Sequence, residues 1–177
     1  SQLTTVFGCL KQSGYEFAII RGFRSSGSVD PYVVKNIENA RAAGIPYVDV
    51  YLFPCVSCGN PGTQSAELLS AISGQNYGMV WVDIEVYAWT SSKTTNQRFI
   101  TEMVGNLTSR GAKVGIYTSY YNWESIVGLD WTGVSRYPLW YAHYDNSPSF
   151  GDFKAFGGWS KPSIKQYAGD KTVCGAG

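Results

Sequence analysis

Histidine is almost missing from this chain of 177 residues, in which His143 is the only one. A zinc site built from two cysteines and two histidines is therefore excluded. Charge is also scarce, because charged residues make up 15% of the chain and the formal net charge is +1. No basic stripe is present to neutralise phosphates, so we expect no nucleic-acid partner. We expect His143 to be a structural residue or to lie at the rim of a site.

Several motifs and segments are missing as well. The sequence has no G-x-x-x-x-G-K-[ST] loop and no G-x-G-x-x-G after a strand, which argues against a nucleotide cradle. No G-x-S-x-G elbow is present to form a triad with the single histidine. No apolar run is long enough to span a membrane, and no signal peptide begins the chain, as in a processed protein. We expect a monomer that needs no cofactor and no metal.

The four cysteines leave three kinds of site open. Cys55 and Cys58 form a C-x-x-C motif, which is typical of a redox pair, of half a zinc site or of a short disulfide. This motif runs into a Gly/Pro loop rather than a helix, so a thioredoxin-like role is a minor alternative. Two disulfides, Cys55–Cys58 and Cys9–Cys174, are the economical prediction, although four cysteines allow three pairings. Disulfides indicate an oxidising compartment, and we expect a secreted or lysosomal/phagosomal protein.

Strand-like and helix-like segments alternate along most of the chain. Repeats of roughly thirty residues predict parallel strands with helices outside them, in either a closed barrel or an open sheet. In the segment 30–44, Asp30 is the expected cap, Pro31 the first-turn residue and Gly44 the stop. After about residue 127 the helical patterns fade. The predicted strands are 16–22, 46–53, 79–86, 112–119, 137–144 and 163–169, and the predicted helices are 1–14, 30–44, 63–74, 94–110 and 120–127.

Two carboxylates stand inside the segment MVWVDIEVYAW, residues 79–89, which is otherwise apolar. On a strand, Asp83 and Glu85 point to the same face, and burying them costs several kcal/mol unless they are paired or protonated. Crowding of two like charges raises at least one pKa, which provides an acid beside an ionised partner. Such a pair suits glycoside hydrolysis. The competing interpretation is a metal-bound or ion-paired strand end, with Arg21 as the partner.

Aromatic and amide side chains are predicted at the same rim of the sheet, at the ends of neighbouring strands. The chain is rich in such groups, with 13 tyrosines and 6 tryptophans, and convergent aromatic side chains are typical of binding pockets. A carboxylate pair surrounded by them indicates a carbohydrate site. The rim residues are Tyr51, Phe53, Tyr117, Trp140, Tyr144, Gln166 and Tyr167.

Six segments in succession resemble the family 25 glycoside hydrolases, the Chalaropsis-type lysozymes, and are most similar to the nematode and protist branch. They are GYEFAIIRGF, AAGIPYVDVYLFPC, YGMVWVDIE, GIYTSYYNW, PLWYAHYDNSPSF and KQYAGD, and they cover nearly the whole chain. The resemblance implies one catalytic domain over residues 1–177. It also implies a modified TIM-like α/β barrel with five βα units followed by strands with few helices. The implied activity is hydrolysis of the β-1,4 bond between N-acetylmuramic acid and N-acetylglucosamine in bacterial peptidoglycan.

The resemblance also assigns roles to residues. Glu85 is similar to the family's general acid and Asp83 to its partner carboxylate, which orients the 2-acetamido group or stabilises the cation-like centre. Arg21 is expected to pair with this acidic cluster. The positions that line the sugar cleft in the family match Tyr51, Tyr117, Trp140, Tyr144, Arg21 and Gln166.

The chain departs from the family pattern in three places. Leu52 stands where many relatives have a histidine, and the opening D-V-S-like and closing D-x-N-like acidic motifs have no counterpart here. The chain also starts with a helix, so we expect that a leading strand and a closing strand are lacking from this sequence. These departures keep an alternative open, a non-hydrolytic relative that binds glycan in the same cleft.

Overall fold

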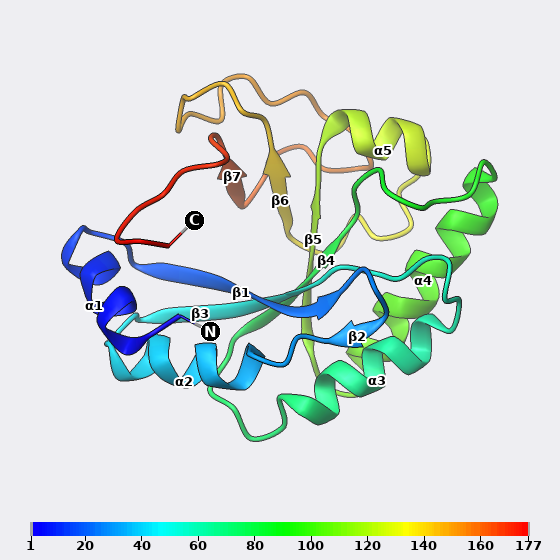
Figure 1. Cartoon of the computed structure of the whole chain (residues 1–177). Coiled ribbons are helices and arrows are strands. Elements are labelled where there is room, and N and C mark those ends of the chain that lie inside the picture. The colour runs from blue at the N-terminus through cyan, green and yellow to red at the C-terminus, as the bar shows by residue number, and fades with distance from the viewer. Residues whose placement is uncertain (1, 177) are drawn as a thin grey trace.

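Seven strands form one curled sheet in the order β2-β1-β3-β4-β5-β6-β7 (Figure 1). The computed structural model describes residues 2–176, so Ser1, expected near the start of the first helix, lies outside the described residues. β1 and β2 are antiparallel, and all other neighbours are parallel. The predicted α/β fold is confirmed as a modified TIM-like barrel, with its sheet present as a half-barrel that ends at β2 and β7.

Helices and strands alternate as the sequence predicts, up to the last two strands. α1 is followed by four βα units, where the family resemblance implies five. The two-residue strand β2 was not predicted, because it is too short to show a pattern. The elements are α1 (Thr4–Gln12), β1 (Phe17–Arg24), β2 (Ser28–Val29), α2 (Val33–Ala42), β3 (Tyr47–Leu52), α3 (Pro61–Ala71), β4 (Met79–Asp83), α4 (Lys93–Ser109), β5 (Lys113–Thr118), α5 (Tyr120–Ile126), β6 (Leu139–Ala142) and β7 (Ile164–Gln166).

The start of α2 differs from the prediction. Asp30 is not the helix cap and Pro31 is not in the first turn, because the N-cap position is Tyr32. The Asp30 carboxylate instead accepts a hydrogen bond from the backbone N–H of Tyr32 at 2.9 Å, which forms a turn before the helix. The predicted stop is confirmed: Gly44 has a φ of +83°, a left-handed conformation that favours glycine just beyond a helix.

The core lies between the sheet and the helices α2, α3 and α4, which run along one side of it (Figure 1). Neighbouring residues in register on parallel strands share a face. Leu52, Val82 and Ile116 form one such apolar row, and Val50 in register with Val80 begins another. The helices contribute the remaining buried side chains of this layer, among them Ile37, Leu68, Ile100, Met103 and Leu107. Burial of this layer determines which face of each strand packs against the helices. The alternate residues of each strand then lie on the concave face of the sheet.

Trp81 fills the floor of the concave face. It is 2% exposed, and its indole N–H donates a hydrogen bond to the Asp49 carboxylate at 2.8 Å. Its ring lies directly over Gly115 on the next strand, where an added Cβ would be 2.4 Å from the ring. Only glycine leaves room for the indole at this position. The filled floor therefore closes the barrel interior below the ends of the strands.

Both predicted disulfides are confirmed. Cys9 and Cys174 are bonded with their Cα atoms 5.9 Å apart, and they tie α1 to the tail after β7. Cys55 and Cys58 close a short loop after β3. The amide of Gln64 holds this loop by accepting from the backbone N–H of Cys55 and donating to its carbonyl, both at 2.9 Å. Both links fit folding in an oxidising compartment.

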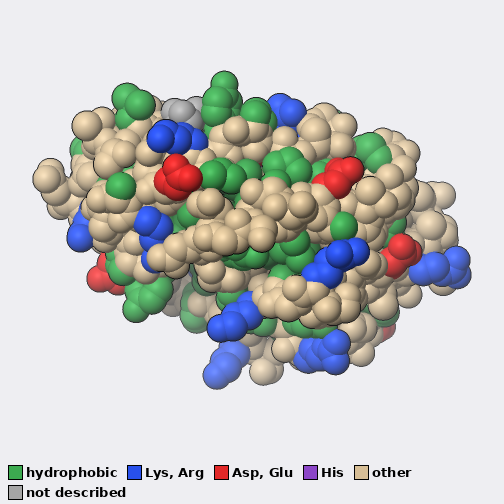
Figure 2. Space-filling model, turned by 90° about the horizontal axis from the view of Figure 1, so that it is seen from below, with side chains coloured by type: hydrophobic (Ala, Val, Ile, Leu, Met, Phe, Trp, Pro, Cys, Tyr) green, Lys and Arg blue, Asp and Glu red, His purple; other side chains and the backbone are tan. Residues whose placement is uncertain are grey.

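The surface on the helix side carries charges of both signs, spread among apolar and polar side chains (Figure 2). Within residues 2–176, no helix has the length and hydropathy needed to cross a membrane.

Candidate active site

The two carboxylates lie where β4 leaves the sheet. Asp83 is the last residue of β4 and is 5% exposed, whereas Glu85 is half-buried two positions further on. The predicted strand 79–86 is therefore three residues too long. After the backbone N–H of Ile84 donates to the carbonyl of Tyr117 at 2.8 Å, the chain turns away from the sheet. Asp83 thus lies at the carboxyl edge of the strands, where chemistry gathers in parallel α/β folds.

The surroundings of Asp83 disfavour its ionised form. Burial, the nearby charge of Glu85 and a hydrogen bond with the Glu85 carboxyl raise the pKa of Asp83 well above its ordinary value. The prediction that crowding raises one pKa of the pair is confirmed.

One oxygen of Asp83 lacks a partner. Asp83 Oδ1 is buried and has no hydrogen-bond donor among the described residues. An unsatisfied buried acceptor costs about 1–3 kcal/mol, so its presence indicates a position that a ligand donor completes. The oxygen is the kind of acceptor that an amide N–H or a hydroxyl of a sugar would satisfy.

The backbone around Glu85 is fixed although it belongs to no strand. The hydroxyl of Thr118 donates to the Ile84 carbonyl at 2.7 Å, and the indole N–H of Trp89 donates to the Glu85 carbonyl at 2.9 Å. Thr118 is fully buried, and Trp89 packs edge-on against Phe99 with ring centroids 5.5 Å apart. These anchors fix the backbone that carries the Glu85 side chain, as precise chemistry requires.

Arg21 does not pair with this acidic cluster, and that expectation is corrected. Its Nε donates instead to the Asp30 carboxylate at 2.7 Å, and this partner is 5% exposed. The sequence suggested the cluster because Arg21 ends a predicted strand, but β1 continues to Arg24 and the turn before α2 brings Asp30 closer. Arg21 is therefore not the cation that the ion-paired interpretation of Asp83 and Glu85 requires.

An aromatic row flanks the carboxylates on the concave face. Asp83 pairs in register with Tyr117, and Tyr117 with Trp140, on three successive strands. The rings of Tyr117 and Trp140 lie 4.4 Å apart between centroids. The Tyr117 hydroxyl donates to the Gln166 side-chain carbonyl, and burial together with a hydrogen bond to Tyr144 raises the pKa of Tyr117. The structure thus brings these four predicted residues together beside Asp83.

Tyr51 lies on β3, which pairs with β4 on the side away from β5. It pairs in register with Arg21 on β1 and with Trp81 on β4. Burial raises the pKa of Tyr51, the charge of Arg21 opposes this effect, and the charge of Asp83 adds to it. Tyr51 is therefore close enough to the carboxylates to sense their charge.

A cavity of about 510 Å³ opens beside Glu85. Of the residues predicted from sequence, Glu85, Tyr117 and Tyr144 line it, whereas Asp83, Tyr51, Trp140, Arg21 and Gln166 lie outside its lining. Its size suits a small ligand, and aromatic side chains dominate its walls. His143, expected as a structural or rim residue, also lines the cavity. Sequence reasoning missed the rest of the wall, which is formed by Ser119, Tyr120, Tyr121, Asn122, Tyr141, Ala142, Asp152, Phe153, Lys154 and Phe156.

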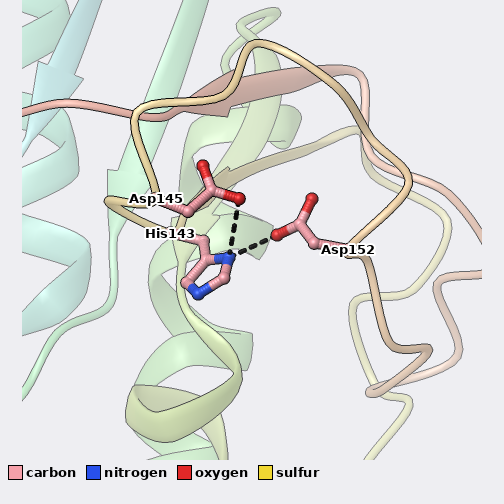
Figure 3. A group of neighbouring side chains, drawn as sticks. All are labelled: His143, Asp145 and Asp152. Atoms are coloured by element: carbon pink, nitrogen blue, oxygen red, sulfur yellow. Dashed lines mark hydrogen bonds and ion pairs between the residues drawn. The ribbon is translucent and has the colours of Figure 1, made fainter.

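An ion network forms the far wall of this cavity. His143, Asp145 and Asp152 come from the loop that follows β6, and their side chains point toward one another (Figure 3). His143 Nδ1 contacts a carboxylate oxygen of Asp152 and lies 3.5 Å from one of Asp145. The Tyr141 hydroxyl donates to Asp152 at 2.6 Å. His143 is therefore a rim residue, as expected, with its Nδ1 held by a carboxylate.

Lys165 on β7 completes the network. Its side chain is 2% exposed, and its ammonium donates to Asp145, to Asp152 and to the Ser149 carbonyl, each at 2.9 Å. Burial acts to raise the pKa of Asp152, but hydrogen bonds from Tyr141, Lys165 and His143 hold that pKa well below its ordinary value. The Lys165 hydrogen bond likewise lowers the pKa of Asp145. The ammonium already occupies the cationic position between the two carboxylates.

Comparisons with known proteins identify the family to which the chain is similar. A family model described as Lysozyme-like protein 1 matches residues 2–167. The chain is 50% identical over 173 residues to the Probable GH family 25 lysozyme 2 of Dictyostelium discoideum, covering 97% of this chain and 81% of the relative. It is 43% identical over 177 residues to Lysozyme-like protein 5 of Caenorhabditis elegans, covering 97% of this chain and 82% of the relative.

Solved structures share the architecture. A muramidase from Trichobolus zukalii superposes with a TM-score of 0.79 at 24% identity, over 96% of this chain and 84% of that protein. A family GH25 lysozyme from Aspergillus fumigatus superposes with a TM-score of 0.74 at 19% identity, over 90% of this chain and 79% of that protein. At such identities the likeness carries the fold alone.

Proposed function

The chain belongs to the family 25 glycoside hydrolases, and we propose that it is a lysozyme that cleaves bacterial peptidoglycan. The bond cleaved is the β-1,4 linkage between N-acetylmuramic acid and N-acetylglucosamine. The observation that carries this proposal is the Asp83–Glu85 pair, in which a buried carboxyl of raised pKa adjoins a half-buried carboxyl at an aromatic cavity. A relative named a probable lysozyme, at 50% identity, and one named a lysozyme-like protein, at 43% identity, support it.

Glu85 acts as the general acid because it lines the cavity and can reach a bound glycoside. Burial favours retention of a proton by the carboxyl pair, and Glu85 passes that proton to the glycosidic oxygen as the bond breaks. Asp83 lies behind Glu85, and its free Oδ1 accepts from the 2-acetamido N–H of the sugar. As the proton leaves, the negative charge that develops on the pair stabilises the oxocarbenium-like centre.

Aromatic side chains hold the sugars. Pyranose rings present apolar faces that pack on aromatic rings, while their hydroxyls meet the tyrosine hydroxyls and side-chain amides around them. Tyr117 and Trp140 lie beside the reacting pair, and Tyr144 is 57% exposed at the cavity mouth. In this proposal Tyr51, Arg21 and Gln166 complete the cleft on both sides of β4.

We place this activity in a secreted or lysosomal/phagosomal protein that digests bacterial cell walls as a monomer, for defence or for feeding. The two disulfides support the oxidising compartment. The partner in this proposal is the bacterial wall itself.

The test is release of reducing ends from purified peptidoglycan by the unaltered chain and by its Glu85→Gln variant. We expect the variant to lose about 10²- to 10⁴-fold in rate, because glutamine cannot donate the proton. Glu102→Gln, an exposed change of the same kind on α4, is the matched control and should cleave normally. Near-normal melting temperatures for both variants would show that they fold.

Cleavage that persists in Glu85→Gln would refute its role as the acid. Absence of cleavage by every form, with glycan still bound, would favour the non-hydrolytic alternative.

A further inference from the structure

Asn122 connects the cavity wall to the segment that carries Glu85. It lies in α5, and its side-chain carbonyl accepts a hydrogen bond from the backbone N–H of Val86 at 3.0 Å. Val86 directly follows Glu85, so this bond fixes the peptide on the C-terminal side of the acid. Together with the bonds from Thr118 and Trp89, it anchors the backbone on both sides of Glu85.

The orientation of the Asn122 amide follows from this contact. A backbone N–H can only donate, so the side-chain atom that faces Val86 must be the oxygen Oδ1. The two N–H groups of Nδ2 therefore remain for another acceptor, and none is found for them among residues 2–176. The residue is half-buried and lines the same cavity as Glu85 and Tyr117. Its backbone N–H is already used, because it donates to the Ser119 hydroxyl at 3.1 Å.

We infer that Asn122 binds the substrate as well as positioning Glu85. Its Nδ2 donates a hydrogen bond to an oxygen of the bound glycan, either a hydroxyl or an acetamido carbonyl, while its Oδ1 keeps hold of Val86. This inference rests on the proposed function and deepens it by adding a substrate-binding residue on α5. One amide then joins the sugar to the backbone of the acid, so that substrate and catalyst share one rigid support.

The complementary group in the site is Asp83. Asp83 Oδ1 is a buried acceptor without a donor among the described residues. Asn122 Nδ2 has no acceptor among them either, but it is not one of their buried unpaired atoms, so it stays open to solvent or to a ligand in the cavity that Asn122 lines. A sugar that bears hydroxyls and an acetamido group offers both a donor and an acceptor. A hydrocarbon ligand would satisfy neither atom.

The test separates the two halves of the Asn122 amide. Binding of a soluble peptidoglycan fragment, a tetrasaccharide of alternating N-acetylglucosamine and N-acetylmuramic acid, is measured by calorimetry in the Glu85→Gln background. That background prevents turnover and removes the repulsion that a new carboxylate at position 122 would feel from Glu85. Asn122→Asp keeps an acceptor oxygen for Val86 N–H but removes the amide donors, whereas Asn122→Ala removes both.

We expect both second-site variants to bind the fragment about 3- to 10-fold more weakly than the Glu85→Gln parent, the loss of one net hydrogen bond. Asn122→Asp should keep the parent's melting temperature, and Asn122→Ala should lower it. In the chain with Glu85 intact, Asn122→Ala should also lower kcat, because the Val86 peptide is no longer held.

Two outcomes overturn the inference in distinguishable ways. Equal binding by the parent and by Asn122→Asp would show that Asn122 serves only to position Glu85. Absence of fragment binding by the parent, together with absence of cleavage by the unaltered chain, would overturn the proposed function and this inference with it.

Discussion

Two acidic pairs each contribute one residue to the cavity lining, Glu85 from one and Asp152 from the other, and their charges are balanced in different ways. Asp83 and Glu85 have no cation bonded to either carboxylate among the described residues, and one oxygen of Asp83 has no partner. Asp145 and Asp152 share the ammonium of Lys165, and His143 and Tyr141 add further hydrogen bonds to Asp152. We call the first pair incomplete, because one of its acceptors has no donor. We call the second a closed network, because both of its carboxylates are bonded to a cation.

The pKa values follow this difference in opposite directions. Burial and the neighbouring charge raise the pKa of Asp83, whereas hydrogen bonds from Lys165 and its neighbours lower the pKa of Asp145 and of Asp152. A closed network contributes to stability, while an incomplete one stores a proton and an acceptor for a ligand. Acidic residues near a cavity are thus distinguished by their partners, because both pairs consist of carboxylates and residue type alone does not separate them.

The largest expected effect is on the incomplete pair. Asp83→Asn should lower kcat for peptidoglycan cleavage by about 10²-fold, because the pair can no longer carry the charge that develops as Glu85 gives up its proton. The measurement is the initial rate of reducing-end release at saturating substrate. Asp130→Asn, an exposed change outside the cavity lining, is the control and should leave the rate unaltered. A fully active Asp83→Asn would remove Asp83 from the mechanism.

A smaller and different effect is expected for the closed network. Lys165→Met should lower the melting temperature by about 4 °C or more, since the loss leaves two carboxylates and the Ser149 carbonyl without their shared donor. The loop after β6 should loosen, so KM should rise several-fold while kcat stays within about 2-fold, because this loop forms the cavity wall and not the reacting pair.

Lys165→Arg should restore part of the stability, and Lys35→Met on the exposed face of α2 is the matched control. A fall in kcat with unaltered KM would contradict a wall-forming role and would place the network in the chemistry.

Much of the fold could be predicted from the sequence, because apolar periodicity and glycine stops depend on local residues. The strand–helix alternation and the place of the Asp83–Glu85 pair near a strand end follow from such patterns, whereas both disulfides were predicted as the economical pairing of four cysteines. Strand ends were less predictable: the apolar run continues to Val86, but hydrogen bonding across the sheet ends β4 at Asp83. The Arg21–Asp30 ion pair was missed for a similar reason, since it depends on how a turn folds back.

The cavity wall was the least predictable part. Residues 143–156 form an irregular loop with no hydrophobic period, and its shape depends on Lys165, which follows it in the chain. Asn122 was missed because the segment YYNW was interpreted as the start of a helix and not as part of the cavity wall. A signal was available, since four polar or aromatic side chains, residues 119–122, directly follow β5 at the same edge as Asp83.

The most direct test of the difference between the two pairs is the free energy of unfolding of Asp83→Asn and of Asp152→Asn between pH 3 and pH 7. Ionising Asp83 costs the folded state stability, because its folded pKa is raised; this cost grows as the pH rises above the ordinary value of 3.8. Asp152 has a lowered folded pKa, so its contribution to stability is full above its ordinary pKa and is lost as the pH falls.

At pH 7 we therefore expect Asp83→Asn to raise the free energy of unfolding by about 1 kcal/mol and Asp152→Asn to lower it by about 1–3 kcal/mol, with both differences shrinking toward pH 3. Opposite signs at pH 7 would confirm that one pair is kept for reaction and the other for structure. Destabilisation by both substitutions would contradict the account, because Asp83 would then be a structural carboxylate like Asp152.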